Sequence, residues 1–418
     1  MKVLVIGGGA IEHAIVWRLS QSRHVNKIYC CPGNAGIAEI AECIDVSPNN
    51  LSAFVDFVKY EWIDLTIVGT EGLFLKGIVD VFEKQGCRVL GLDKKAAQLV
   101  SNRAFLKNLM RFHRIPTAEY KVFTSYLHAE DYVRLKGAPI VIKTNSTSEE
   151  RGIIVASTVE EAIDTLRLIM KDRLFGEAGK QVIIEEVLNG EKISFIILTD
   201  EKSVIPFAGL YKYQRLFDGD KGPNTRGMGA FSPSGVITKE LSTAIMVKIM
   251  KPIIKALKAE GIKYKGFLSA DLIINKNKPY VLEFSGYLGD PETQTILPSL
   301  KTDFAEVALA ITEEKLSDID IRWKQETAVC IVSSSKGYPD KYQKGFVVTG
   351  LEKIKTMKDV IVFHDGTTFK GDDIVTSGGR VVSVTATGDD IKDASNKAYE
   401  AIEKINFKGM HYRKDIGI

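Results

Sequence analysis

The sequence has few cysteines and no long hydrophobic run, and both absences narrow the class of protein. Its 418 residues include five scattered cysteines, in no spacing that is typical of a metal site. This pattern predicts reduced intracellular thiols rather than a disulfide framework. No apolar run approaches the roughly 20 residues that cross a bilayer. Residues 1–6 run directly into a glycine cluster, which indicates a strand and not a signal peptide. With no signal peptide and no membrane span, we expect a cytoplasmic protein with no membrane partner.

A strong net charge is also missing. The formal charge is +3, with 26% charged and 45% hydrophobic residues, which is ordinary for a globular protein. We therefore expect no nucleic-acid partner, because nucleic-acid binding usually leaves a basic footprint. The length is sufficient for two to four domains with sizeable cores.

Two neighbouring apolar segments each contain one acid. Residues 267–274 and 280–284 have the composition of buried strands, and they contain Asp271 and Glu283. Residues 276–279 are typical of a hairpin turn, so both carboxylates are predicted to lie on one face of paired strands. Two carboxylates together with nucleotide phosphates commonly hold Mg²⁺. The alternative is a salt-bridged or edge-exposed acid in each strand.

The N-terminal segment has the opening of a nucleotide-binding fold. A strand at residues 2–6 leads into three glycines, 7–9, and then into a helix. The third glycine of the dinucleotide fingerprint is missing, because Glu12 occupies its place. A βαβ scaffold whose helix N-terminus faces an anion is therefore favoured over a redox-cofactor site. Strands and helices alternate up to about residue 95, which predicts a doubly wound domain.

After residue 95 the sequence carries basic residues at a helix and a strand end, and polar loops follow. A helix carries Arg103 and Lys107, and a strand at 139–143 ends in Lys143. The polar loop 144–152 that follows could close over phosphates. Residues 218–229 are rich in Gly, Asn and Asp and are predicted to form a long functional loop.

Ordered motifs along essentially the whole chain resemble those of the phosphoribosylamine–glycine ligase (glycinamide ribonucleotide synthetase) family of ATP-grasp enzymes. The matching motifs lie at residues 12–13, 32–36, 104–107, 115–118, 185–186, 222–229, 289–294, 335–339, 378–381 and 409–413. Matches on this scale are specific for a fold and family, and less specific for the substrate.

The resemblance implies a mixed α/β and α+β architecture of three parts. These are an N-terminal doubly wound α/β domain (1–95), a two-lobed ATP-grasp core (96–324, with the small lobe at about 117–190) and a small β-rich C-terminal domain (325–418). The last boundary has independent support, because β-like runs at 327–332, 360–363 and 381–385 precede a final helix near 392–404.

The resemblance also implies ATP-dependent ligation of a carboxylate to an amine through an acyl phosphate. It implies ATP and Mg²⁺ (or Mn²⁺) as cofactors, small-molecule amine and amino acid substrates, and a monomer or homodimer. Nucleotide contacts are implied for Lys107, Lys143, Glu185, Glu186, Leu188 and Glu191, and metal contacts for Asp271, Glu283 and Ser285. Catalytic roles are implied for Arg215, Asn224 and Arg380, and substrate contacts for Gly9, Glu12, His13, Gly33, Asn34, Glu71, Arg226, Asp290, Pro291 and Glu292. The alternatives are solvated lysines at 107 and 143, and a plain hairpin acid at 191.

Several positions depart from the family pattern. Ile11 stands where the family has an arginine that would face a sugar phosphate, and Asp271 stands where the family usually has glycine. The other departures are Ala10, Thr70, the loop 144–151, Tyr211, Lys212, Tyr213, Gln214, Arg226, Ser285 and Tyr287.

These departures leave three interpretations of function. The first is an active ligase of this family with a changed substrate, in which any sugar phosphate binds more weakly. The second is a phosphoribosylamine–glycine ligase of purine synthesis in which Arg226 replaces the lost arginine. The third is a non-catalytic homologue that binds a nucleotide or a partner. The acid at 271 favours changed chemistry over decay, since an inactive chain would have no need of it.

Overall fold

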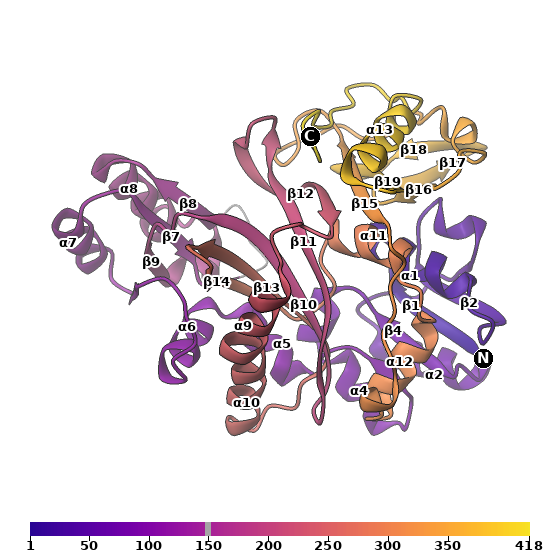
Figure 1. The fold of residues 1–418 in the computed structure, drawn as a ribbon, viewed down its shortest axis with the longest axis horizontal. Coiled ribbons are helices and arrows are strands. Elements are labelled where there is room, and N and C mark those ends of the chain that lie inside the picture. Colours follow the sequence, from indigo (N-terminus) through magenta and orange to yellow (C-terminus); the bar gives the residue numbers. More distant parts are fainter. Residues whose placement is uncertain (147–151) are drawn as a thin grey trace.

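The structure is a computed structural model that describes residues 1–146 and 152–418. Most of the predicted phosphate-covering loop, residues 147–151, lies outside the described residues. In Figure 1 the small lobe with α7 and α8 stands at the left, and the C-terminal domain lies above the N-terminal domain at the right. None of the described helices is both long and apolar enough to cross a membrane.

The N-terminal domain is built on a five-stranded parallel sheet in the order β3-β2-β1-β4-β5. Its strands are β1 (Lys2–Gly7), β2 (Lys27–Pro32), β3 (Glu42–Cys43), β4 (Leu65–Val68) and β5 (Val89–Leu90). Helices α1 (Ala10–Ser20), α2 (Leu51–Glu61), α3 (Glu71–Leu75) and α4 (Ile78–Lys84) connect them. The near-continuous apolar strands are buried from both faces, as parallel sheets require. The predicted doubly wound domain is confirmed.

The small lobe is a four-stranded antiparallel sheet in the order β6-β9-β7-β8. Its elements are β6 (Tyr120–Phe123), α7 (Tyr126–Lys136), β7 (Ile140–Thr144), β8 (Ile153–Ala156), α8 (Val159–Leu166) and β9 (Val182–Glu186). Two helices, α5 (Lys94–Ser101) and α6 (Arg103–Phe112), precede the lobe where a single helix was expected. They separate at Asn102, whose side chain accepts a hydrogen bond from Phe105 N and so begins α6.

The centre of the molecule is an eight-stranded antiparallel sheet in the order β14-β13-β10-β11-β12-β15-β19-β16. Its strands are β10 (Glu191–Asp200), β11 (Val204–Phe217), β12 (Lys221–Ser232), β13 (Lys265–Asn275), β14 (Lys278–Ser285), β15 (Thr327–Ser334), β16 (Val360–His364) and β19 (Arg380–Gly388). The remaining elements are α9 (Lys239–Ile245), α10 (Lys251–Ala259), α11 (Glu292–Ile296), α12 (Phe304–Thr312), α13 (Ile391–Ile402) and the hairpin β17 (Thr367–Lys370) with β18 (Asp373–Thr376). Because β12 pairs with β15, the C-terminal strands continue the sheet of the large lobe.

Residues 218–229 do not form the predicted long loop. Most of them belong to β12, which pairs with β11 after a short turn. The pairing shifts register twice, between Tyr213 and Arg215 and between Arg215 and Phe217. Gly222 (φ 81°) and Gly227 (φ 129°) adopt backbone angles that other residues disfavour. The glycines thus provide the backbone angles that an irregular, bulged strand pair requires, and they do not form a free loop.

The hairpin of β13 and β14 forms as predicted. Lys276 and Asn277 make a two-residue turn with φ values of 47° and 62°, the left-handed angles that tight hairpins require. Asp271 then lies directly opposite Glu283 in the register. The prediction that the two acids share one face of paired strands is therefore confirmed.

Candidate active site

A cavity of about 180 Å³ lies between the small lobe and the central sheet. We call it the interlobe cavity. It has apolar walls, including Val141, Leu188 and Leu282. Eight residues predicted for the nucleotide, the metal or catalysis line it: Lys143, Glu185, Glu186, Leu188, Arg215, Asn224, Asp271 and Glu283. Apolar walls with a few charged groups at one side suit a base and its phosphates.

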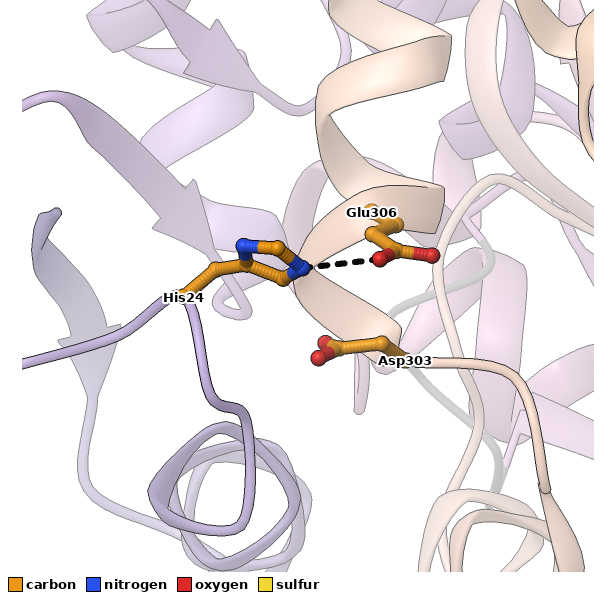
Figure 2. A group of neighbouring side chains, drawn as sticks. All are labelled: His24, Asp303 and Glu306. Atoms are coloured by element: carbon orange, nitrogen blue, oxygen red, sulfur yellow. Dashed lines mark hydrogen bonds and ion pairs between the residues drawn. The ribbon is translucent and has the colours of Figure 1, made fainter.

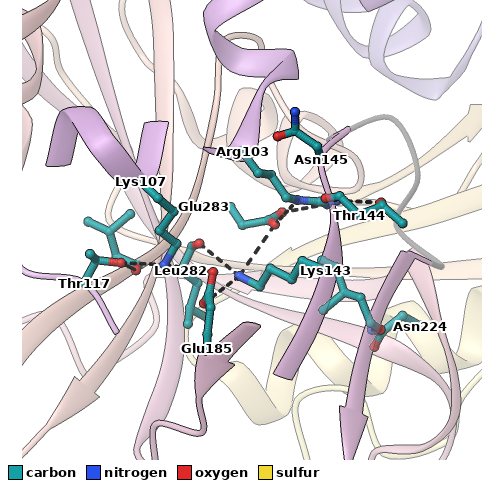
Figure 3. A network of polar contacts seen from close by, with 12 residues as sticks. Arg103, Lys107, Thr117, Lys143, Thr144, Asn145, Glu185, Asn224, Leu282 and Glu283 are labelled. Carbon is teal, nitrogen blue, oxygen red and sulfur yellow. Dashed lines mark hydrogen bonds and ion pairs between the residues drawn. The ribbon is translucent and has the colours of Figure 1, made fainter. Parts of the chain in front are cut away.

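The two predicted ATP lysines share one carboxylate (Figure 3). Glu185 Oε1 lies 3.1 Å from Lys107 Nζ, and Glu185 Oε2 lies 3.2 Å from Lys143 Nζ. Lys107 also donates to Thr117 Oγ1 at 2.7 Å. All three charged side chains are at most 5% exposed. Burial lowers the pKa of Lys107 to about 8, with a further contribution from the charge of Lys143 and partial compensation by Glu185.

Arg103 holds the second acid of the hairpin. Its Nε lies 2.5 Å from Glu283 Oε1, and its NH1 group donates to the backbone carbonyls of Thr144 and Ser146. Burial alone would raise the pKa of Glu283, but Arg103 and Lys143 together hold that pKa below its ordinary value. Sequence reasoning placed Arg103 on a helix and gave it no role. Its partner is 180 positions away, so no local signal could have indicated the pair.

A second cavity of about 400 Å³ lies between the N-terminal domain, the central sheet and the C-terminal domain. We call it the interdomain cavity. It is lined by the predicted substrate or catalytic residues Gly9, Glu12, Glu71, Asn224, Arg226, Asp290, Glu292 and Arg380, and by Ser285. Six residues line both cavities: Ile153, Lys212, Gln214, Asn224, Asp271 and Glu283. The paired acids therefore stand at the junction of the two spaces, where Asp271 is fixed by a 2.5 Å hydrogen bond from Ser194.

Acids outnumber bases around the interdomain cavity. Its lining contains the seven acids Glu12, Glu71, Asp271, Glu283, Asp290, Glu292 and Asp365, and the three bases Lys212, Arg226 and Arg380. Lys212 Nζ lies 3.1 Å from Glu292 Oε1. Arg380 contacts Asp290, and its Nε lies 3.2 Å from Asp365 Oδ2. Asp365 was not predicted from the sequence, because it lies in a short turn after β16 with no motif around it.

Carboxylates gather at the N-terminus of α1. Glu12 Oε2 accepts a 2.7 Å hydrogen bond from Gly9 N, and the backbone of Ala10 favours the charged form of Asp365. A Cβ at Gly69 would lie 2.1 Å from Glu12 Oε1, so glycine there leaves room for the acid. Burial raises the pKa of Glu12 to about 7, helped by the charges of Asp365 and Asp290. Burial also raises the pKa of Asp365 to about 6, against the opposing effect of Arg380.

Some predicted contact residues lie outside the linings of both cavities. His13 Nδ1 accepts a 2.8 Å hydrogen bond from His364 N, and Asn34 Nδ2 donates to the carbonyls of Gly8 and His364 at 2.9 and 2.8 Å. The pair thus ties the N-terminal domain to the end of β16. Four others also lie outside both linings. Lys107 lies behind Glu185, and Gly33 is next to Asn34 in the sequence. Glu191 is exposed at the start of β10, and Pro291 is buried. Their roles in binding stay predictions.

Among the described residues, one group has three possible metal-ligand atoms within 4.8 Å of one another: His24, Asp303 and Glu306 (Figure 2). Its members already have structural partners. His24 Nε2 lies 2.8 Å from Glu306 Oε1, and Asp303 accepts hydrogen bonds from Ser22 Oγ and from Ala305 N at the start of α12. The group ties the N-terminal domain to α12, and its partly exposed acids are satisfied by these partners.

Comparison with known proteins identifies the family. Three family models cover nearly all of the chain: the N domain of phosphoribosylglycinamide synthetase at residues 1–100, its ATP-grasp (A) domain at 101–293 and its C domain at 328–418. The chain belongs to the phosphoribosylglycinamide synthetase family. It is therefore an ATP-grasp ligase of the ADP-forming class that makes C–N bonds. This result favours the two ligase interpretations over the non-catalytic one.

Relatives match over their whole length. A phosphoribosylamine–glycine ligase of Caldanaerobacter subterraneus is 45% identical over 416 residues, which cover 100% of this chain and 99% of the relative. An Escherichia coli phosphoribosylamine–glycine ligase is 42% identical over 421 residues, covering 100% and 98%. The crystal structure of the Thermotoga maritima phosphoribosylamine–glycine ligase superposes with a TM-score of 0.83 at 27% identity, covering 99% of this chain and 100% of that one.

A more distant neighbour shares the fold alone. The biotin carboxylase domain of a Hydrogenobacter thermophilus 2-oxoglutarate carboxylase, solved with MgADP and bicarbonate, has a TM-score of 0.73 at 16% identity and covers 98% of this chain and 91% of that one.

Proposed function

We propose that this chain joins an amino acid carboxylate to an amine through an acyl phosphate, and that its amine differs from phosphoribosylamine. The observation that carries the ligase chemistry is the meeting of two cavities at Asp271 and Glu283. The interlobe cavity offers apolar walls and the buried lysine Lys143, which suit ATP. The interdomain cavity is the larger space, and it opens on the same pair of acids, where the γ-phosphate would meet the carboxylate.

The reaction has two displacements. A carboxylate oxygen attacks the γ-phosphorus, the bond to the bridging oxygen breaks, and ADP leaves. The neutral amine nitrogen then attacks the acyl carbon, the bond from that carbon to the phosphate oxygen breaks, and inorganic phosphate leaves while the nitrogen loses a proton. Lys107 and Lys143 would hold the nucleotide phosphates, and Asn224 lies at the junction where the two substrates meet.

The junction fits a magnesium ion. Asp271 and Glu283 face each other in register, and hard carboxylate oxygens are the ligands that Mg²⁺ prefers. Each carboxylate is oriented by a neighbour, Asp271 by Ser194 and Glu283 by Arg103. Ser285 lines the same cavity and is proposed as a weak or water-mediated third contact. Mg²⁺ held there would neutralise charge on the transferring phosphoryl group.

The position of the departures from the family pattern supports a changed amine. Eight of them line the interdomain cavity: Ile11, Thr70, Lys212, Gln214, Arg226, Asp271, Ser285 and Tyr287. The residues proposed for ATP that line only the interlobe cavity, Lys143, Glu185, Glu186 and Leu188, all match the pattern. Five of the eight line the interdomain cavity alone, and the other three, Lys212, Gln214 and Asp271, lie at the junction of the two cavities. Changes centred on the interdomain cavity alter what it binds and leave the apolar nucleotide walls in place.

A second candidate is phosphoribosylamine–glycine ligation itself, which the names of relatives 41–45% identical over the whole chain favour. In this case Arg226, which lines the interdomain cavity together with Gly9 and Ile11, would replace the lost arginine. The expected monomer or homodimer applies to both candidates.

A product screen by mass spectrometry tests the proposal. The protein, ATP and Mg²⁺ are incubated with panels of amino acids and amines, with ADP release followed in parallel. Steady-state kinetics with phosphoribosylamine and glycine separate the candidates. A kcat/KM in the ordinary enzyme range of about 10⁴–10⁸ M⁻¹s⁻¹, together with complementation of a purine auxotroph, would establish the second candidate and overturn the first.

A further inference from the structure

The N-terminus of α1 is already closed by the protein's own carboxylates. A glycine turn before a helix ordinarily presents free backbone N–H groups to an anion such as a phosphate. Here Gly9 N donates to Glu12, and the backbone of Ala10 lies close enough to Asp365 to favour its charged form. A Cβ added at Gly9 would lie 3.2 Å from Asp365 Oδ1, which places that carboxylate directly over the turn. A residue from the C-terminal domain thus takes the place that a bound anion would occupy.

The backbone around Asp365 is held from several sides. His364 N donates to His13 Nδ1, and Asn34 Nδ2 donates to His364 O. Gly366 N donates to Arg380 O at 3.1 Å, and Asp365 N donates to Val381 O at 2.9 Å. These bonds fix the backbone on both sides of Asp365, so its Cα is held beside the turn.

Two of the three cations of the interdomain cavity are paired with carboxylates. Arg380 contacts both Asp290 and Asp365, and Lys212 contacts Glu292. Arg226 is close enough to Asp365 to stabilise its charged form. Glu283 is already paired with Arg103 and Lys143, so six further acids and three bases remain in the lining, and a phosphate dianion would add like charge to this acidic surface.

We propose that Asp365 determines the substrate specificity of this site and that the amine substrate carries no phosphate. The inference rests on the proposed ligase function. Asp365 and Glu12 present carboxylate oxygens, which are hydrogen-bond acceptors, so the far end of the amine carries hydrogen-bond donors, such as the hydroxyls of an amino sugar. The cavity of about 400 Å³ has room for such a molecule beside an amino acid.

Binding of two probes tests the role of Asp365 directly. Ribose 5-phosphate and ribose are titrated by calorimetry into the wild type, Asp365→Asn and Asp365→Ala. The matched control is Asp372→Ala, an exposed acid of the same domain. We expect both Asp365 variants to bind ribose 5-phosphate at least about tenfold more tightly than the wild type, with the control unchanged and ribose affected little. Asp365→Asn keeps the size of the side chain, so equal affinity in that variant and the wild type would overturn the proposal.

Turnover provides the second test. ADP release is measured with ATP, Mg²⁺, glycine and either ribosylamine or its 5-phosphate. We expect a higher kcat/KM for the phosphate-free amine in the wild type and a shift towards the phosphorylated amine in Asp365→Asn. The opposite preference in the wild type would contradict the inference. Absence of ADP release with every amine would instead refute the ligase proposal, and the ribose 5-phosphate titration would still decide the role of Asp365. Equal melting temperatures of the variants would show that they fold.

Discussion

The interlobe and interdomain cavities adjoin each other but balance their charges differently. Around the interlobe cavity Lys107 and Lys143 share Glu185, and Arg103 meets Glu283, so buried cations and anions are matched. Around the interdomain cavity, with the paired Glu283 left aside, six acids face three bases. Matched buried charges suit a site in which phosphates and a metal replace internal partners at little net cost. An acidic surplus disfavours a phosphate dianion more than the single charge of an amino acid carboxylate, so the two cavities have separate tasks: ATP chemistry in one and recognition of the substrates in the other.

The largest effect is expected at the junction that the cavities share. Asp271→Asn keeps the size of the side chain and can still accept the hydrogen bond from Ser194, but it removes one charge. We expect kcat for ADP release to fall by about 10²–10³-fold, the scale of losing one preorganised electrostatic contact, with an unchanged melting temperature.

Ser285→Ala is the matched control for Asp271→Asn, because it lies on the other strand of the hairpin and should have a much smaller effect. Full activity in Asp271→Asn would show that the acid is incidental. The junction would then not unite the two cavities in one reaction.

The next effect concerns the interlobe cavity alone. Lys143→Met should weaken ATP binding by roughly 2–4 kcal/mol, because a buried charged contact loses one partner and Glu185 keeps only Lys107. Calorimetric titration of ATP measures the change. Lys239→Met, at an exposed position outside both cavity linings, is the control. Unchanged affinity in Lys143→Met would place the nucleotide elsewhere.

Matched charges also predict a pH dependence of ATP binding. The pKa of Lys107 is lowered to about 8, so the side chain loses its charge as pH rises through this value. We expect ATP affinity to fall by about tenfold between pH 7 and pH 9 relative to Lys107→Arg, whose guanidinium stays charged. Parallel pH profiles of the two proteins would argue that Lys107 does not act on the phosphates.

The hairpin acids could be predicted from the sequence, whereas Asp365 could not. A short turn between two apolar strands fixes the register, so the alternation of side chains alone places Asp271 opposite Glu283. Asp365 reaches the site through its ion pair with Arg380 and its position beside Gly9, which come from distant parts of the chain. Contacts between such distant segments leave no local sequence pattern from which they could be predicted. The same limit explains residues 218–229, where composition predicted a loop and pairing with β11 made a strand.

The smallest expected effect tests the acidic surplus of the interdomain cavity through stability. The pKa of Glu12 is raised to about 7 in the folded protein from an ordinary value of 4.5. The folded state therefore binds more protons than the unfolded chain between these values. The stability that this provides is fully present below pH 4.5 and is lost as pH rises through 7. Glu12→Gln removes the titration, so at pH 8 it should be more stable than the wild type, and at pH 5 the difference should be small.

We expect the gain in Glu12→Gln to be on the order of 1 kcal/mol, less than the full pKa shift implies, because Asp365 beside it also takes up protons in this range. Denaturant midpoints of both proteins at pH 5 and pH 8 measure it, with the exposed Glu352→Gln as a control that should show no pH-dependent difference. A wild type that is as stable as Glu12→Gln at pH 8 would mean that the carboxylates at the start of α1 are compensated in the folded protein. The interdomain cavity would then be as well matched in charge as its neighbour, and the argument against a phosphorylated amine would lose its electrostatic basis.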